Sequence, residues 1–219
     1  MKQMLFPTLV ALSLTGCAAT SDLPTGYALT PGQPEGLLIV SLTLSGEPLE
    51  KISSFEYRIR ALAPEEREAV IARPYFESVL QHARGASRTT ARAGGGQEVV
   101  VKGPSSAEPL DLWEGATAGR VASLRLPPGA YEFYTWQLRD RAEASGGTEY
   151  SPKRPFSYRF VIKPGQATYI GQLNLDLREW KAQKITVEDR RERDLALLNK
   201  RMPSIGSVQV SSEVGQVHP

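Results

Sequence analysis

The sequence predicts an all-β fold, an antiparallel β-sandwich with a short inserted helix and an amphipathic helix near its C-terminal end. Three observations lead to this prediction. The 219 residues include 19 glycines and 16 prolines, which favour many turns between short strands. Apolar and polar residues alternate with a period of two in several runs, as in half-buried antiparallel strands. No long helical pattern separates these runs, so we expect six to eight strands in one domain over residues 36–187.

The first two strands are predicted by their alternation. The apolar residues at every second position are Leu38, Val40, Leu42, Leu44, Phe55, Tyr57, Ile59 and Ala61. Charged residues, Glu56, Arg58 and Arg60, stand between the apolar positions of the second run. One face of each strand should therefore lie in the core and the other in water.

The middle of the chain predicts further strands around a clear turn. A short apolar run at 99–101 and an alternating run at 122–126 precede Pro127-Pro128-Gly129. Residues 131–138 then carry apolar side chains on both faces, which predicts a strand covered on both sides, with Trp136 in the core.

Two later runs, 156–162 and 169–177, flank the turn Lys163-Pro164-Gly165-Gln166. Because each run alternates and the turn between them is short, we expect the two strands to pair as a hairpin.

Helical signals occur at two places. Pro64-Glu65-Glu66 begins a helical pattern that predicts a short inserted helix, with acidic residues near the positive end of the helix dipole. Residues 188–202 place Leu195, Leu198 and Met202 on one face of a second helix, which should pack on the sandwich; docking to a partner is the alternative. The polar residues 203–219 are expected to form a mobile tail.

The N-terminus carries an export signal. Lys2 precedes an apolar stretch of about ten residues, too short to span a bilayer. The stretch ends in Leu14-Thr15-Gly16-Cys17, which resembles the lipobox of bacterial lipoprotein signals. The resemblance implies removal of residues 1–16, a covalent diacylglycerol on Cys17 and an N-acyl chain on its amino group. An ordinary secretory signal is the alternative.

Cys17 is the only cysteine, so it has no partner for a disulfide within the chain, and lipidation accounts for it. Residues 17–35 are rich in Pro, Gly, Ser and Thr and predict a flexible, lipidated tether. Ala18 stands where Gram-negative lipoproteins retained in the inner membrane commonly have Asp. We therefore expect a lipid-anchored protein of the outer membrane that faces the periplasm.

Two segments carry a second resemblance. Leu126-Pro127-Pro128-Gly129-Ala130-Tyr131 resembles the strand-turn-strand signature of PEGA-like and transthyretin-like sandwich modules. The segment 161–171 is similar to a hairpin of uncharacterised bacterial lipoproteins. The resemblance implies an immunoglobulin- or transthyretin-like sandwich and carries no binding residue with it.

Two features could contact an envelope component. Arg84, Arg88 and Arg92 stand four residues apart in a glycine-containing segment, and their guanidinium groups suit phosphate or carboxylate groups, such as those of lipopolysaccharide. Trp113 could stack on a sugar of a glycan or cover a sheet edge, and the same alternatives apply to Trp180. Solvated loops and covered edges explain the same residues without a ligand.

Catalytic motifs are absent from the sequence. The two histidines, His82 and His218, lie outside any recognisable nucleophile motif, and no metal or cofactor motif occurs. The carboxylates at the predicted helix starts, Asp189 and Asp194 among them, suit capping, although a carboxylate-dependent hydrolase is an alternative. We therefore expect a non-catalytic binding or assembly module whose partner is an envelope protein or polymer. The formal net charge of +2 gives no reason to expect nucleic acid.

Overall fold

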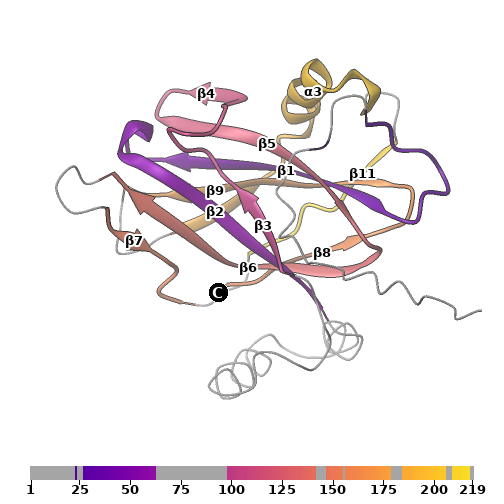
Figure 1. Cartoon of the computed structure of the whole chain (residues 1–219), viewed down its shortest axis with the longest axis horizontal. Helices are drawn as coiled ribbons and strands as arrows, with labels where there is room; N and C mark the ends of the chain where they lie inside the picture. The colour runs from indigo at the N-terminus through magenta and orange to yellow at the C-terminus, as the bar shows by residue number, and fades with distance from the viewer. Residues whose placement is uncertain are drawn as a thin grey trace, which may run out of the picture.

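A computed structural model describes residues 23, 27–62, 98–141, 147–154, 156–178, 184–205 and 209–217. Several predicted features lie outside these residues: the lipobox at 14–17, the inserted helix at 64–71, the three arginines of 84–92, and Trp180. The described part is mostly β-sheet, in two sheets that pack against each other (Figure 1). The predicted all-β sandwich class is therefore supported.

The first sheet has six strands, and we call it sheet 1. Its order is β10 (Lys184–Glu188), β9 (Ala167–Asp176), β1 (Gly36–Ser45), β5 (Thr117–Leu126) and β4 (Leu112–Glu114), with β11 (Val210–Ser212) also beside β9.

Sheet 2 has five strands. Its order is β3 (Val99–Lys102), β2 (Ile52–Ala61), β6 (Gly129–Asp140) and β7 (Glu149–Tyr150), with β8 (Tyr158–Ile162) also beside β6. The helical elements described are η1 (Leu49–Lys51), α3 (Arg191–Arg201) and η2 (Pro203–Ile205). No helix among the described residues is long and apolar enough to cross a bilayer.

Sheet 1 is mixed, so the prediction of a purely antiparallel fold is wrong. β9 runs parallel to β1 and to β11, while the other pairs, including β1 with β5 and β2 with β6, are antiparallel. Alternation in a sequence reports which side of a strand is buried and not the direction of its neighbour.

The predicted hairpin of residues 156–177 is also wrong. β8 pairs with β6 in sheet 2, whereas β9 pairs with β1 in sheet 1, so the turn at 163–166 crosses from one sheet to the other. The Leu37 amide donates to the Gln166 carbonyl at 2.9 Å, which holds the start of β9 beside β1. A Pro-Gly turn ends a strand without specifying which sheet receives the next one.

The inward residues predicted for the first two strands are confirmed, but the prediction that the other face of the first strand lies in water is wrong. Leu37, Ile39 and Ser41 on that face are fully buried, because α3 covers the outer side of sheet 1. The residues of the first two strands that face the inter-sheet core are Leu38, Val40, Leu42, Leu44, Phe55, Tyr57 and Ile59. Trp136 is 1% exposed in the same core, as predicted. Tyr131 is also buried, and its hydroxyl donates to the Pro127 carbonyl at 2.7 Å across the preceding turn.

β6 and β9 each contain one extra residue, a β-bulge, after which the positions that face the core and the positions that face outward are interchanged. The pairing of β2 with β6 shifts at Tyr134, so Phe133 and Trp136 both face the core, although they stand an odd number of positions apart. In β9 the shift falls at Gly171, whose φ is +102°. The sequence of β6 suggested a strand with two apolar faces because the bulge shifts the alternation partway along the strand. The prediction that both faces are covered by apolar layers is therefore wrong.

Helix α3 covers the outer side of sheet 1, where Leu198 is fully buried against Leu37, Ile39, Val121 and Tyr169. This confirms that the amphipathic helix packs on the sandwich. The helix begins three residues later than predicted, because residues 184–188 form β10.

Both terminal segments differ from their predictions where they are described. In the expected tether, Leu29 is buried, and the Tyr27 carbonyl accepts a hydrogen bond from the Ser204 hydroxyl. In the expected mobile tail, residues 210–212 form β11, and the Gly215 amide donates to the Tyr158 hydroxyl at 3.0 Å. Apolar residues of both segments, Tyr27 and Leu29 in the first and Val210 and Val214 in the second, pack in the cluster beneath α3, and these hydrogen bonds add to the contact. Single apolar residues in a polar segment form no period that would predict such packing.

Candidate functional site

The outer side of sheet 2 carries a set of paired charges that we call the charged face. Its residues are Glu56, Arg58, Arg60, Glu98, Glu132, Tyr134, Gln137, Arg159 and, toward β7, Arg139 and Glu149. Those in β2 alternate with core residues, so the pleat of the strand places them on the side opposite the core.

Arg58 holds one half of the charged face together. Its guanidinium donates to Glu98 Oε1 at 2.7 Å, to Glu56 Oε1 at 3.0 Å and to Gln137 Oε1 at 2.7 Å. The Tyr134 hydroxyl hydrogen-bonds the other Glu98 oxygen. Burial, assisted by the Glu98 hydrogen bond, raises the pKa of Tyr134 to about 12. The phenol therefore stays protonated at neutral pH and acts as a donor.

Glu132 holds the other half together, and only 2% of it is exposed. Arg60 Nε donates to its Oε1 at 2.6 Å, and the Ser157 hydroxyl donates to its Oε2 at 2.6 Å. Arg159 approaches the same carboxylate at 3.5 Å. A carboxylate that is buried and paired in this way has its charge neutralised and its acceptors used, which suits a structural role.

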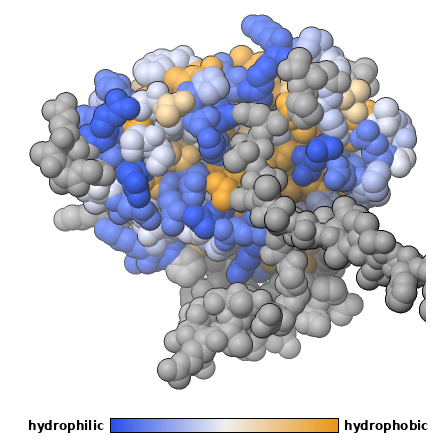
Figure 2. Space-filling model, in the orientation of Figure 1, coloured by the Kyte–Doolittle hydropathy of each residue, from blue (hydrophilic) through white to orange (hydrophobic). Residues whose placement is uncertain are grey.

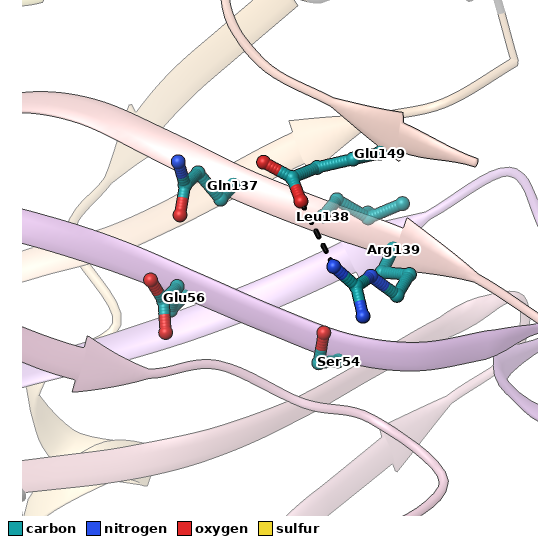
Figure 3. Close-up of a pocket in the computed structure, with 6 residues that line it drawn as sticks. All are labelled: Ser54, Glu56, Gln137, Leu138, Arg139 and Glu149. Atoms are coloured by element: carbon teal, nitrogen blue, oxygen red, sulfur yellow. Dashed lines mark hydrogen bonds and ion pairs between the residues drawn. The ribbon is translucent and has the colours of Figure 1, made fainter. Parts of the chain in front are cut away.

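A shallow trough of about 240 Å³ crosses the charged face between β2, β6 and β7 (Figure 3). Its lining residues are Ser54, Glu56, Gln137, Leu138, Arg139 and Glu149. Arg139 and Glu149 form an ion pair at 3.0 Å along one side, and both side chains are about half exposed. The trough offers donors and acceptors to a polar ligand. The Leu138 side chain is buried in the inter-sheet core, so this residue borders the trough through its backbone.

Trp113 is the one predicted contact residue within the described part of the chain. It lies on the short edge strand β4, opposite Ala118 of β5, and 59% of it is exposed. Trp113 therefore stands at a sheet edge without covering it. The predicted anion contacts, Arg84, Arg88 and Arg92, lie outside the described residues.

The carboxylates of α3 have structural roles. The N-cap residue of α3 is Arg190, which makes no side-chain cap hydrogen bond, so neither Asp189 nor Asp194 is the predicted cap. Asp189, one residue before the cap, accepts the backbone amide of Arg191 at 3.0 Å. Asp194 is fully buried and accepts hydrogen bonds from Tyr169 at 2.8 Å and from Arg193 at 2.7 Å. Within the described ranges, no group of three or more His, Cys, Asp or Glu residues could hold a metal ion.

The charged face was not predicted from the sequence as a possible binding site. The alternation of Glu56, Arg58 and Arg60 with apolar residues already indicated an outward charged row. Their partners, Glu98 and Glu132, come from strands 40 and 72 residues away along the chain, and no local pattern links them.

No protein-family model matches the chain, and no curated protein matches it. One similar solved structure is a leucine-rich repeat protein from Bacteroides thetaiotaomicron, with 11% identity and a TM-score of 0.33, matched over 67% of this chain and 14% of that one. Another is a candidate cell-adhesion protein from Bacteroides ovatus, with 13% identity and a TM-score of 0.28, over 71% and 44% of the two chains. The chain thus spans less than half of either structure, and these likenesses are too weak to carry an argument.

Proposed function

We propose that this protein is a lipid-anchored module of the cell envelope whose β-sandwich binds or assembles an envelope component without catalysing a reaction. The observation that carries the proposal is Leu14-Thr15-Gly16-Cys17 at the end of a short apolar segment, with Cys17 the only cysteine. Several acyl chains hold a folded domain on a membrane without a spanning helix, since each buried CH₂ contributes about 0.8 kcal/mol. We place the protein in the outer membrane, facing the periplasm.

The charged face supports binding by polar contacts. In the view of Figure 2, hydrophilic residues dominate the described surface, and hydrophobic residues occur in small, separate groups. The side chains around the trough are held by their mutual hydrogen bonds, so a ligand would meet groups that are already ordered. An envelope protein or polymer with polar groups of both signs fits such a surface. We also propose the immunoglobulin- or transthyretin-like class, supported by the turn before the buried Tyr131.

Replacing the anchoring cysteine should separate the protein from its lipid. In cells fed an alkyne fatty acid, the wild type is expected to become labelled and to partition into detergent, while Cys17→Ala should do neither. Envelope cross-linking and affinity purification of both forms would then identify the partner. A labelled Cys17→Ala variant, or an unlabelled wild type, would contradict lipidation at this residue.

A glycan contact through Trp113 is the second candidate, because this aromatic ring is 59% exposed on an edge strand. Trp113→Ala is expected to weaken binding to purified envelope polysaccharide about tenfold, since losing one stacking contact of about 1.4 kcal/mol has that effect. Isothermal titration calorimetry would measure it. Val161→Ala, which removes the other large exposed apolar side chain described, is the control. Equal affinities for both variants would argue against Trp113 as a contact.

A further inference from the structure

Residues 27–35, which precede β1, are fixed to one end of the sandwich. The Glu35 carbonyl accepts the Gly165 amide at 2.9 Å, and a Cβ on Gly165 would lie 2.9 Å from the Gly32 backbone nitrogen. The turn at 163–166 therefore packs directly against residues 30–35. In Figure 1 the indigo segment before β1 lies at the right of the molecule, and β7 lies at the left.

Contacts fix this segment even closer to the cysteine. Tyr27 packs against the cluster beneath α3, and the guanidinium of Arg125 lies 5.7 Å from the centre of its ring. Leu23 also packs against this cluster. Leu23 lies six positions after Cys17. The chain between these two residues therefore spans at most about 22 Å when fully extended.

The opposite end of the sandwich lies farther away than this reach. β1 runs the length of sheet 1 from Gly36, and its ten residues span about 33 Å at roughly 3.3 Å each. The connection from β6 to β7, which includes Thr148, lies at that far end, because Asp140 pairs with Ile52 at the end of β2 remote from residues 129–133.

We infer that the anchored protein has a fixed orientation, in which the end formed by residues 27–35 and the turn at 163–166 faces the phospholipid headgroups and the β7 end points away. This inference rests on the proposed anchor. The trough beside β7 is then held away from the bilayer, where a partner can reach it.

The chemistry of the end formed by residues 27–35 and the turn at 163–166 suits a surface of lipid headgroups. A shallow hollow of about 620 Å³ lies there, lined by residues 29, 31, 32, 164–166, 209 and 211, none of which is charged. Two carboxylates at this end are paired, Glu35 with Arg125 and Glu213 with Lys163, each at 3.6 Å. Anionic headgroups would therefore meet little net negative charge from these groups.

The orientation can be tested with single cysteines, because lipidation consumes Cys17 and an introduced cysteine becomes the only free thiol. Gln166→Cys and Thr148→Cys lie at the two ends, and both native side chains are exposed. Each lipidated variant is labelled with a donor fluorophore and reconstituted into phosphatidylethanolamine and phosphatidylglycerol vesicles that contain an acceptor-labelled lipid. We expect energy transfer from position 166 to exceed transfer from position 148 severalfold.

A long tether provides the control. Inserting about twenty Gly and Ser residues after Ser21 places a flexible chain between the anchor and the docked Leu23, and the two positions should then give similar transfer. Equal transfer from both positions in the original protein, with the protein floating on the vesicles, would overturn the orientation alone. Failure of the lipid-bearing protein to float with the vesicles would overturn the anchor, and the orientation with it.

Discussion

Replacing Trp136 by alanine is expected to lower the free energy of unfolding by about 3–5 kcal/mol, the largest effect of any single change considered for this protein. Trp136 is 1% exposed and lies in the inter-sheet core, where its ring packs edge-on against Phe55 at 6.4 Å. Alanine would remove that contact and leave a cavity between the sheets. Urea unfolding followed by circular dichroism measures the change.

Trp136→Phe is the matched variant. The indole Nε1 is buried and has no hydrogen-bond acceptor among the described residues, which costs stability in the native protein. Phenylalanine loses volume but also removes this buried donor, so its cost should be only about 1 kcal/mol. A loss below about 1 kcal/mol for Trp136→Ala would show that the two sheets do not depend on this side chain.

Asp194→Ala is expected to cost about 3 kcal/mol, because it leaves buried partners without their acceptor. Tyr169 donates to one oxygen of Asp194 at 2.8 Å, and Arg193 donates to the other at 2.7 Å and 2.9 Å. The bond from Tyr169 joins the first turn of α3 to β9. Asp194→Asn keeps an acceptor for Tyr169 and removes the buried charge, so the loss should be smaller. The exposed Glu192→Ala on the same turn should leave the free energy of unfolding nearly unchanged.

The same residue predicts a dependence on pH. Burial raises the pKa of Asp194 above its ordinary value of 3.8, and the opposing hydrogen bonds from Arg193 and Tyr169 do not cancel the effect. Glu114, which also faces Arg193, adds to the rise. The folded protein therefore binds this proton more tightly than the unfolded chain, and stability falls as pH rises through the raised pKa.

Compared with Asp194→Asn, the wild type should gain stability as the pH is lowered from about 7 toward about 4. Urea unfolding of both proteins at several pH values measures the difference. A constant difference across this range would show that Asp194 has the same pKa in the folded and unfolded states.

Much of the core could be predicted because burial of one face leaves a period-two pattern in the sequence. The inward residues of β1 and β2 followed this rule, and α3 was predicted by Leu198 and its neighbours. The rule failed in β6 and β9, where single extra residues at Tyr134 and Gly171 reverse the inward and outward positions. A bulge changes the register of the pairing, which a single strand does not reveal.

The candidate site was harder to predict from the sequence than the core. The outward charges of β2 were visible in the sequence, but their partners Glu98 and Glu132 reach them only when distant parts of the chain come together. Glu149 likewise reaches Arg139 only when β7 pairs with β6. The trough also depends on β7, which pairs with β6 on the side away from β2 and supplies Glu149.

The sequence by itself determined the all-β character, the residues of the main core, the amphipathic helix and the expectation of a lipid anchor at Cys17. Only the tertiary structure decided that β1 and β9 run parallel, that β8 and β9 belong to different sheets, and that both described terminal segments dock on the sandwich. The physical reason is that burial acts on each residue locally, whereas strand partners and docked segments are selected by hydrogen bonds and apolar contacts between parts of the chain far apart in sequence.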